Sequence, residues 1–191
     1  MEASQARPLD YEGRELPDRH EIVDSALVKK ASPSYSHGAL QGTLFSMLTP
    51  FRGPRGKSRP GGWLFGTEID IQLASGQRYV PDLAGWRLDS FEASDLQVFS
   101  GIPCHQRPDW VCEILSSSTA SRDLGTKKRT YHLAGVSCYW IVDPTKRTLT
   151  VLHWAKDGYQ RALGFGVNDK VHADPFGEVE IDMCELFALL P

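Results

Sequence analysis

The sequence predicts an α/β or α+β domain in which a mixed β-sheet is flanked by helices. A helical apolar spacing comes first, segments with an apolar–polar period of two follow, and a second helical spacing precedes further strands. The chain has 191 residues, of which 41% are hydrophobic and 24% charged, as in globular domains with their own core. We therefore expect one domain over residues 19–191, preceded by a flexible arm over residues 1–18.

Charge and cysteine usage limit the classes of function. The net charge of -3 excludes a strongly basic protein that coats nucleic acid. The first ten residues lack the apolar core of a signal peptide, and no run of about 18 apolar residues indicates a membrane span, so we expect a cytoplasmic protein without membrane contact. The four cysteines are Cys104, Cys112, Cys138 and Cys184, and they lack the spacing of metal ligands. We expect most of them to be reduced residues of the core.

The N-terminal part of the chain predicts an arm, a hairpin and a helix. Residues 1–18 are polar, contain two prolines and show no apolar period. Two short apolar runs within residues 20–31 indicate a hairpin. The apolar residues that follow have a helical spacing, with Ser34 or Ser36 as the N-cap and Pro50 as the stop.

A basic loop is predicted after this helix. Residues 50–62 carry seven Gly or Pro residues and four basic residues, with no acidic residue. This composition predicts a mobile loop. Two interpretations stay open, a solvated surface loop and a loop that contacts phosphate groups.

Three segments with a period of two predict strands. Residues 62–73 and 77–87 are joined by hairpin-turn residues 74–76, and Asp70 in the first strand is expected to be solvated. Residues 109–115 form the third segment. Its two faces hold Val111, Glu113 and Leu115, and Trp110, Cys112 and Ile114.

A second helix and the last strands complete the predicted fold. Residues 121–134 have a helical spacing with Leu124 and Tyr131 on one side, and Gly135 follows as the left-handed cap residue. The polar segment 88–107 is long enough to be a functional loop. The remaining expectations are strands over residues 136–142, 148–154, 159–163 and 179–181, a helix over 184–190, and core positions for Tyr139, Trp140 and Trp154.

Three carboxylates stand where burial would be costly. Asp82 follows Pro81 within a predicted strand, Glu113 lies in an apolar run, and Glu68 lies within the predicted strand 62–73, where apolar residues alternate with polar ones. An ionised carboxylate among apolar neighbours requires a partner or a metal ion. If the strands that carry Asp82 and Glu113 are adjacent, their Cβ atoms stand about 4.5 to 5.5 Å apart, close enough for both to bind one Mg²⁺.

A lysine on the second predicted helix adds a cation to this group. Lys127 lies three residues after Leu124 and four before Tyr131, so it shares their core-facing side. Its long stem can be buried while its ammonium group reaches the carboxylates. Lys128 lies close to the same face, and the sequence leaves the choice between the two lysines open.

Six ordered segments resemble a known family. Their order is similar to that of the bacterial Uma-type restriction endonucleases, within the PD-(D/E)XK nuclease superfamily, over roughly residues 20–165. Two positions depart from the pattern, because Leu115 stands where the superfamily motif has its lysine and Ser117 where relatives often have proline. The segments are Ser-Tyr-Ser-His-Gly (34–38), Thr-Glu-Ile-Asp-Ile (67–71), Val-Pro-Asp-Leu-Ala (80–84), Pro-Asp-Trp-Val-Cys-Glu-Ile-Leu-Ser (108–116), Asp-Leu-Gly-Thr-Lys-Lys-Arg-Thr-Tyr (123–131) and Gly-Val-Ser-Cys-Tyr-Trp-Ile-Val-Asp-Pro (135–144).

This resemblance implies a restriction-endonuclease-like core and hydrolysis of DNA phosphodiesters with Mg²⁺ or Mn²⁺. Asp82 and Glu113 would be the metal ligands. Glu68 would be an additional acidic ligand or a group that positions water, and Lys127, supplied by the helix, would be the active-site lysine. DNA is the implied partner, and a homodimer is considered because many nucleases of this fold act as dimers.

Other interpretations of the same residues stay open. Asp82 could be only a turn residue and Glu113 a paired core carboxylate. His37 could contact phosphate at the edge of the site or serve a structural role. The main alternative function is a catalytically silent DNA-binding or scaffolding protein of the same fold, and a third is a carboxylate-pair hydrolase acting on small molecules or sugars.

Overall fold

The computed structural model describes residue 17 and residues 19–91, 103–116 and 120–190. The arm predicted over residues 1–18 therefore lies outside the described residues except for Pro17, as does the middle of the predicted functional loop. Within the described ranges, no helix is long and apolar enough to cross a membrane.

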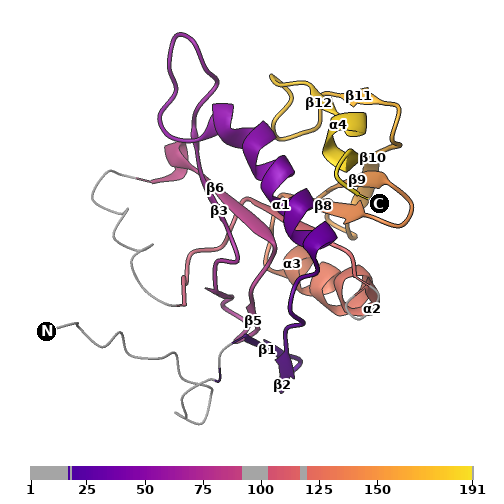
Figure 1. The fold of residues 1–191 in the computed structure, drawn as a ribbon. Helices are drawn as coiled ribbons and strands as arrows, with labels where there is room; N and C mark the ends of the chain where they lie inside the picture. The colour runs from indigo at the N-terminus through magenta and orange to yellow at the C-terminus, as the bar shows by residue number, and fades with distance from the viewer. Residues whose placement is uncertain (1–16, 18, 92–102, 117–119, 191) are drawn as a thin grey trace, which may run out of the picture.

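A six-stranded sheet forms the centre of the fold (Figure 1). Its strand order is β10-β9-β8-β7-β6-β3, and neighbouring strands are antiparallel except for β7 and β8, which are parallel. The mixed sheet expected from the sequence is thus confirmed. Its strands are β3 (Trp63–Thr67), β6 (Leu83–Arg87), β7 (Trp110–Ile114), β8 (Cys138–Asp143), β9 (Thr148–His153) and β10 (Gln160–Phe165).

A smaller sheet carries the N-terminal hairpin. Its order is β2-β1-β5-β4, and every pair of neighbours is antiparallel. The hairpin predicted over residues 20–31 is confirmed, with Asp24 and Ser25 at positive φ in its turn. The strands are β1 (His20–Val23), β2 (Ala26–Lys29), β4 (Ile71–Gln72) and β5 (Arg78–Tyr79).

Two of the predicted strands were wrong in their continuity. Segment 62–73 is divided between β3 and β4, because Glu68 has a φ of 54°, in the left-handed region that turns the chain out of the first sheet. Segment 77–87 is divided between β5 and β6 around Pro81, which cannot donate a ladder hydrogen bond. Asp82 therefore directly precedes β6 instead of lying inside a strand.

Short helices frame the two sheets. Ser34 caps the first helix by accepting a hydrogen bond from the backbone N–H of His37, so the predicted N-cap is confirmed. The second predicted helix contains a π-helical turn over Asp123–Lys127, which the sequence analysis did not anticipate. The elements are α1 (Tyr35–Leu48), η1 (Thr49–Phe51), η2 (Leu88–Ser90), α2 (Ala120–Arg122), α3 (Lys128–Leu133), α4 (Met183–Phe187) and the short strands β11 (Lys170–Val171) and β12 (Ile181–Asp182).

The core lies on both faces of the six-stranded sheet. Helices α1 and α4 pack against one face, and the smaller sheet with α3 packs against the other (Figure 1). The alternation predicted for β7 is confirmed, because Trp110, Cys112 and Ile114 belong to the first core and Val111 to the second. Three of the four free cysteines are buried in these cores, as expected.

Three side chains lie elsewhere than the sequence predicted. Leu124 is 49% exposed, because the π-helical turn changes which residues of the helix face the core. Trp154 is 46% exposed, with its indole N–H donating to a backbone carbonyl of α3. Asp70 is not a solvated carboxylate, since both of its oxygens accept hydrogen bonds from the buried Arg78 guanidinium.

Candidate active site

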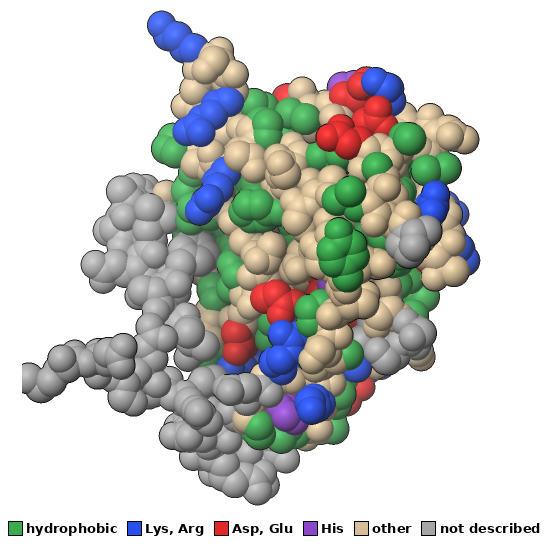
Figure 2. All heavy atoms as spheres, in the orientation of Figure 1, with side chains coloured by type: hydrophobic (Ala, Val, Ile, Leu, Met, Phe, Trp, Pro, Cys, Tyr) green, Lys and Arg blue, Asp and Glu red, His purple; other side chains and the backbone are tan. Residues whose placement is uncertain are grey.

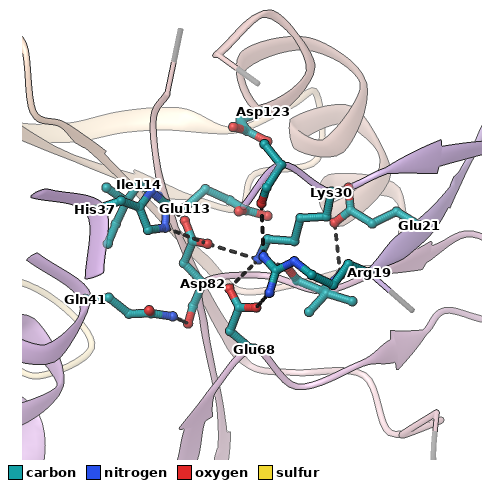
Figure 3. Close-up of polar contacts among 12 residues, drawn as sticks. Arg19, Glu21, Lys30, His37, Gln41, Glu68, Asp82, Glu113, Ile114 and Asp123 are labelled. Carbon is teal, nitrogen blue, oxygen red and sulfur yellow. Dashed lines mark hydrogen bonds and ion pairs between the residues drawn. The ribbon is translucent and has the colours of Figure 1, made fainter. Parts of the chain in front are cut away.

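Asp82 and Glu113 are brought together by the pairing of β6 with β7. These strands are antiparallel, and the register pairs Leu83 with Cys112, so the next position along the pair sets Asp82 opposite Glu113. Both residues are 2% exposed and line one cavity of about 340 Å³, and their side chains lie close together in Figure 3. The sequence analysis made the proximity of these carboxylates conditional on adjacent strands, and the β6–β7 pairing meets that condition although Asp82 directly precedes β6.

Three donors hold the carboxylate of Asp82. Its Oδ1 lies 3.1 Å from Nζ of Lys30 and 3.1 Å from Nε2 of His37, and its Oδ2 accepts a 2.7 Å hydrogen bond from the backbone N–H of Ile114. Burial alone would raise the pKa of Asp82. The hydrogen bond from His37 and the charge of Lys30 outweigh burial and lower the pKa to about 2.

Glu113 has a different environment. Its Oε1 lies 3.0 Å from Nζ of Lys127 and accepts a 3.1 Å hydrogen bond from the hydroxyl of Tyr131. Burial raises the pKa of Glu113 to about 8, because the attraction of Lys127 does not offset the loss of water and the nearby negative charges of Asp123 and Asp82. The two facing carboxyl groups thus differ in their tendency to hold a proton.

The π-helical turn places Lys127 inside the site. Its ammonium group lies 2.9 Å from Glu21, 3.0 Å from Glu113 and 3.5 Å from Asp123. Burial lowers the pKa of this lysine, but the three carboxylates raise it further, so the net shift is upward and the ammonium group keeps its proton. Lys128 is half-buried and lines a separate cavity, so the structure brings only the first of the two candidate lysines to the carboxylates.

Glu68 lies at the edge of the same cavity. Its Oε1 is 2.8 Å from Nζ of Lys30, and its Oε2 is 3.3 Å from a guanidinium nitrogen of Arg19. The side chain is about one-third exposed, unlike Asp82 and Glu113. All four residues predicted from the sequence therefore line one cavity, while their roles stay predictions.

The sequence analysis missed two buried charges from the N-terminal hairpin. Glu21 accepts hydrogen bonds from the backbone N–H of Val80 at 3.0 Å and from Arg122 at 3.1 Å, besides its contact with Lys127. Lys30 comes directly after the largely exposed β2, so it has the sequence context of an ordinary surface lysine. A carboxylate beside apolar residues in β1 was the only available signal for Glu21.

The donor chemistry of the site fits a hard divalent cation. Within the described ranges, no group of three or more His, Cys, Asp or Glu side chains is arranged to hold a metal ion. Mg²⁺ is commonly bound by one or two carboxylates and completed by water and substrate phosphates. Asp82 and Glu113 supply such a pair of carboxylates on one cavity wall, so the residues present fit Mg²⁺ or Mn²⁺.

Comparison with known proteins identifies the family of this chain. The model of the family Uma2, described as "Putative restriction endonuclease", matches residues 7–184. The chain belongs to the Uma2 family. The resemblance inferred from the six ordered segments is therefore confirmed, and Uma2 membership supports a nuclease as the general class of this protein.

A solved structure with a similar fold supports this comparison. It is the crystal structure of a "putative nuclease belonging to DUF820" from Anabaena variabilis, with 18% sequence identity and a TM-score of 0.73. The similarity covers 95% of this chain and 98% of that chain, so it extends over the whole fold. No curated protein matches the sequence.

The pKa of Glu113 is expected to make stability depend on pH. Between its ordinary value near 4.5 and about 8, the folded protein holds a proton that the unfolded chain has lost. The free energy of unfolding therefore falls as the pH rises through this window. Glu113→Gln removes this effect, so thermal melts should show the variant stabilised relative to the parent, by roughly 4 kcal/mol at pH 8 and roughly 1 kcal/mol at pH 5.

The substitution Asp82→Asn should act with the opposite sign. Because the folded pKa of Asp82 is about 2 against an ordinary value of 3.8, its ionised form stabilises the fold above pH 3.8, and this stability is lost as the pH falls through 2. The variant should be less stable at neutral pH by about 2 kcal/mol. For both variants, Glu178→Gln at an exposed position is the control and should leave stability unchanged. If Glu113→Gln changed the free energy of unfolding by the same amount at pH 5 and pH 8, the raised pKa assigned to Glu113 would be contradicted.

Proposed function

We propose that this Uma2 protein is a Mg²⁺- or Mn²⁺-dependent endonuclease that hydrolyses DNA phosphodiester bonds. The observation that carries this proposal is the meeting of Asp82, Glu113 and Lys127 on the wall of one cavity. The description of the Uma2 family supports the nuclease class. The homodimer and the cytoplasmic location stay predictions from the sequence.

Asp82 and Glu113 are the proposed metal ligands. When bound, Mg²⁺ or Mn²⁺ supplies a Lewis acid that polarises the scissile phosphate and makes water more acidic. His37 and the backbone N–H of Ile114 fix the orientation of Asp82. Tyr131 does the same for Glu113 by donating its hydroxyl hydrogen bond.

Lys127 contributes a fixed positive charge. Its raised pKa means that it does not act as a general base near neutral pH. Its contacts with Glu113 and Glu21 hold the ammonium group at the cavity wall, where it orients the attacking water or stabilises the charge that develops on the phosphate.

The basic loop is the proposed second contact with DNA. Its four basic side chains are exposed, namely Arg52, Arg55, Lys57 and Arg59. In the described part of the chain, none of these four forms an ion pair. Backbone hydrogen bonds from Gly53 to Trp63 and from Gly62 to Gly53 join the two ends of the loop. Figure 2 shows Lys and Arg side chains gathered at the upper left, where this loop projects in Figure 1.

Helix α1 sets the distance between the loop and the site. His37 in its first turn contacts Asp82, and the loop follows its other end. A helix of 14 residues is about 20 Å long, which is roughly the length of six base pairs of DNA. A duplex lying along this helix could therefore meet the cavity and the loop together.

The catalytically silent alternative also has a specific observation in its favour. Lys30 and Lys127 already neutralise the carboxylates that would bind a metal ion. A stable salt-bridged core of this kind requires no catalysis. Cleavage measurements therefore have to separate the two functions.

DNA cleavage tests the proposed metal ligands. The parent should nick supercoiled plasmid DNA with Mg²⁺ or Mn²⁺ and lose this activity in EDTA, because the carboxylates act through the metal ion. Glu113→Gln and Asp82→Asn should each lower the nicking rate by roughly 100-fold or more.

Glu178→Gln changes an exposed carboxylate that does not line the cavity, so it is the matched control and should cut like the parent. Linear and single-stranded DNA should be included as substrates. Tight Mn²⁺ binding without cleavage of any DNA would favour the silent DNA-binding protein.

Neighbouring lysines provide a matched pair of variants. Lys127→Met should lower the nicking rate by roughly 100-fold, because it removes the cation beside Glu113. Lys128→Met should change the rate by less than about threefold, since this side chain faces another cavity. Equal losses in two variants that both give folded circular dichroism spectra would refute the choice of Lys127.

The loop should contribute to DNA affinity. Replacing Arg55, Lys57 and Arg59 together with Ala should weaken duplex binding by roughly tenfold at physiological salt and lower the salt-dependence slope by about 2 to 3. Binding is measured by fluorescence anisotropy in the Glu113→Gln background, so that DNA is not cut. The control replaces three exposed lysines elsewhere on the protein, namely Lys146, Lys156 and Lys170. Equal weakening of DNA binding in this control would show only a general effect of net charge.

A further inference from the structure

Lys30 is a buried lysine that the proposed reaction does not use. It directly follows β2, is 9% exposed, and lines the same cavity as Asp82 and Glu113. Lysine is almost never buried without partners, because its charge loses the stabilisation of water. The groups around its ammonium therefore indicate what it does.

Three oxygen atoms surround this ammonium group (Figure 3). Nζ lies 2.8 Å from Oε1 of Glu68, 3.1 Å from Oδ1 of Asp82 and 2.6 Å from the carbonyl oxygen of Val80. These contacts use all three N–H donors of the lysine. Burial lowers the pKa of Lys30, but the neighbouring carboxylates, Asp82 first, raise it further, so the group stays charged.

The same oxygens are the kind of ligand that a hard divalent cation takes. Carboxylates and backbone carbonyls bind Mg²⁺ and Mn²⁺ well. A second divalent ion shared by Glu68 and Asp82 would need the position that the ammonium of Lys30 holds. The arrangement is thus a cation site that a tethered side chain already fills.

Glu68 is engaged from both sides by the N-terminal hairpin. One of its oxygens contacts Lys30, and the other contacts Arg19 at 3.3 Å. The two cations are tied to each other, because the backbone N–H of Lys30 donates to the carbonyl of Arg19 at 2.7 Å. This pairing satisfies the carboxylate of Glu68 without a metal ion.

We propose that Lys30 takes the place of a second divalent cation, so that the protein binds one metal ion, at Asp82 and Glu113. This inference rests on the proposed metal-dependent function. Glu68 is then a positioning residue for Lys30 instead of the additional metal ligand predicted from the sequence. Lys30 also presents a permanent positive charge to the cavity in which a phosphate would lie.

Counting metal ions tests the proposal. The full chain is titrated with Mn²⁺ by isothermal calorimetry, as the parent and as Lys30→Met, which keeps a long unbranched side chain without its charge. The parent should bind one ion and the variant two. Two ions in the parent, or no additional ion in Lys30→Met, would overturn the proposal.

Matched variants separate charge from position. Lys29→Met changes the adjacent, exposed lysine, and Lys30→Arg keeps the positive charge, so both should bind one ion. Glu68→Gln provides a second Mn²⁺ titration in case Lys30→Met does not fold, because Glu68 is partly exposed and its substitution disturbs the core less. This variant should still bind one ion with a Kd within about threefold of the parent, and loss of Mn²⁺ binding would overturn the proposal.

The same titration distinguishes this proposal from the proposed function. No ion in the parent but one in Lys30→Met would support the role of Lys30 while contradicting the metal dependence of the parent. No ion in either protein would contradict both.

Discussion

The structure depends on the compensation of carboxylates that are buried together. Glu21, Asp82, Glu113 and Asp123 are all nearly inaccessible, and none could stay ionised there without a nearby positive charge or hydrogen-bond donor. Lys30 and Lys127 provide most of that charge from opposite ends of the group. The N-terminal hairpin, the β6–β7 pair and the π-helical turn are therefore linked by electrostatics as well as by apolar packing.

Compensation is uneven across the site, and this unevenness has chemical meaning. Asp82 receives a backbone N–H, an imidazole and an ammonium group, so its ionised form is strongly favoured. Glu113 is equally buried but receives an ammonium group and a hydroxyl and lies near the negative charges of Asp123 and Asp82, so it holds a proton more readily. In the proposed function, a divalent cation held by both carboxylates would take the place of that proton, since a metal ligand has to be deprotonated. Metal binding would then be coupled to proton release from Glu113 in particular.

Local periodicity was sufficient to predict the central strands but not their breaks. The period of two in β7 correctly separated the faces of Val111 and Cys112, because both faces of this strand are buried in distinct cores. The divisions at Glu68 and Pro81 were missed because a backbone turn between two sheets leaves the alternation on either side intact. The π-helical turn was missed as well, because an apolar spacing of three and four residues assumes a regular α-helix. Leu124 is therefore exposed, although its spacing predicted a core-facing side chain.

Site residues could be predicted from the sequence where they belong to a family motif or where a charged residue stands among apolar neighbours. Asp82, Glu113 and Lys127 were identified in this way, and the structure brings them together. Glu21 and Lys30 were not identified, because their side-chain partners lie between 38 and more than 100 residues away along the chain. Compensation between distant charges is a tertiary property that no short sequence window contains.

The backbone of Val80 shows how the N-terminal hairpin is connected to the site. Pro81 interrupts the strand, so the chain just before Asp82 cannot be fixed by a continuous ladder. Instead, the N–H of Val80 donates to Glu21, and its carbonyl accepts from Lys30. The hairpin itself pairs with β5 at a single register position, and these side-chain contacts add to its attachment. The buried charges of the hairpin thus fix the segment that aims Asp82, and the position of this carboxylate is set by residues more than fifty positions earlier in the chain.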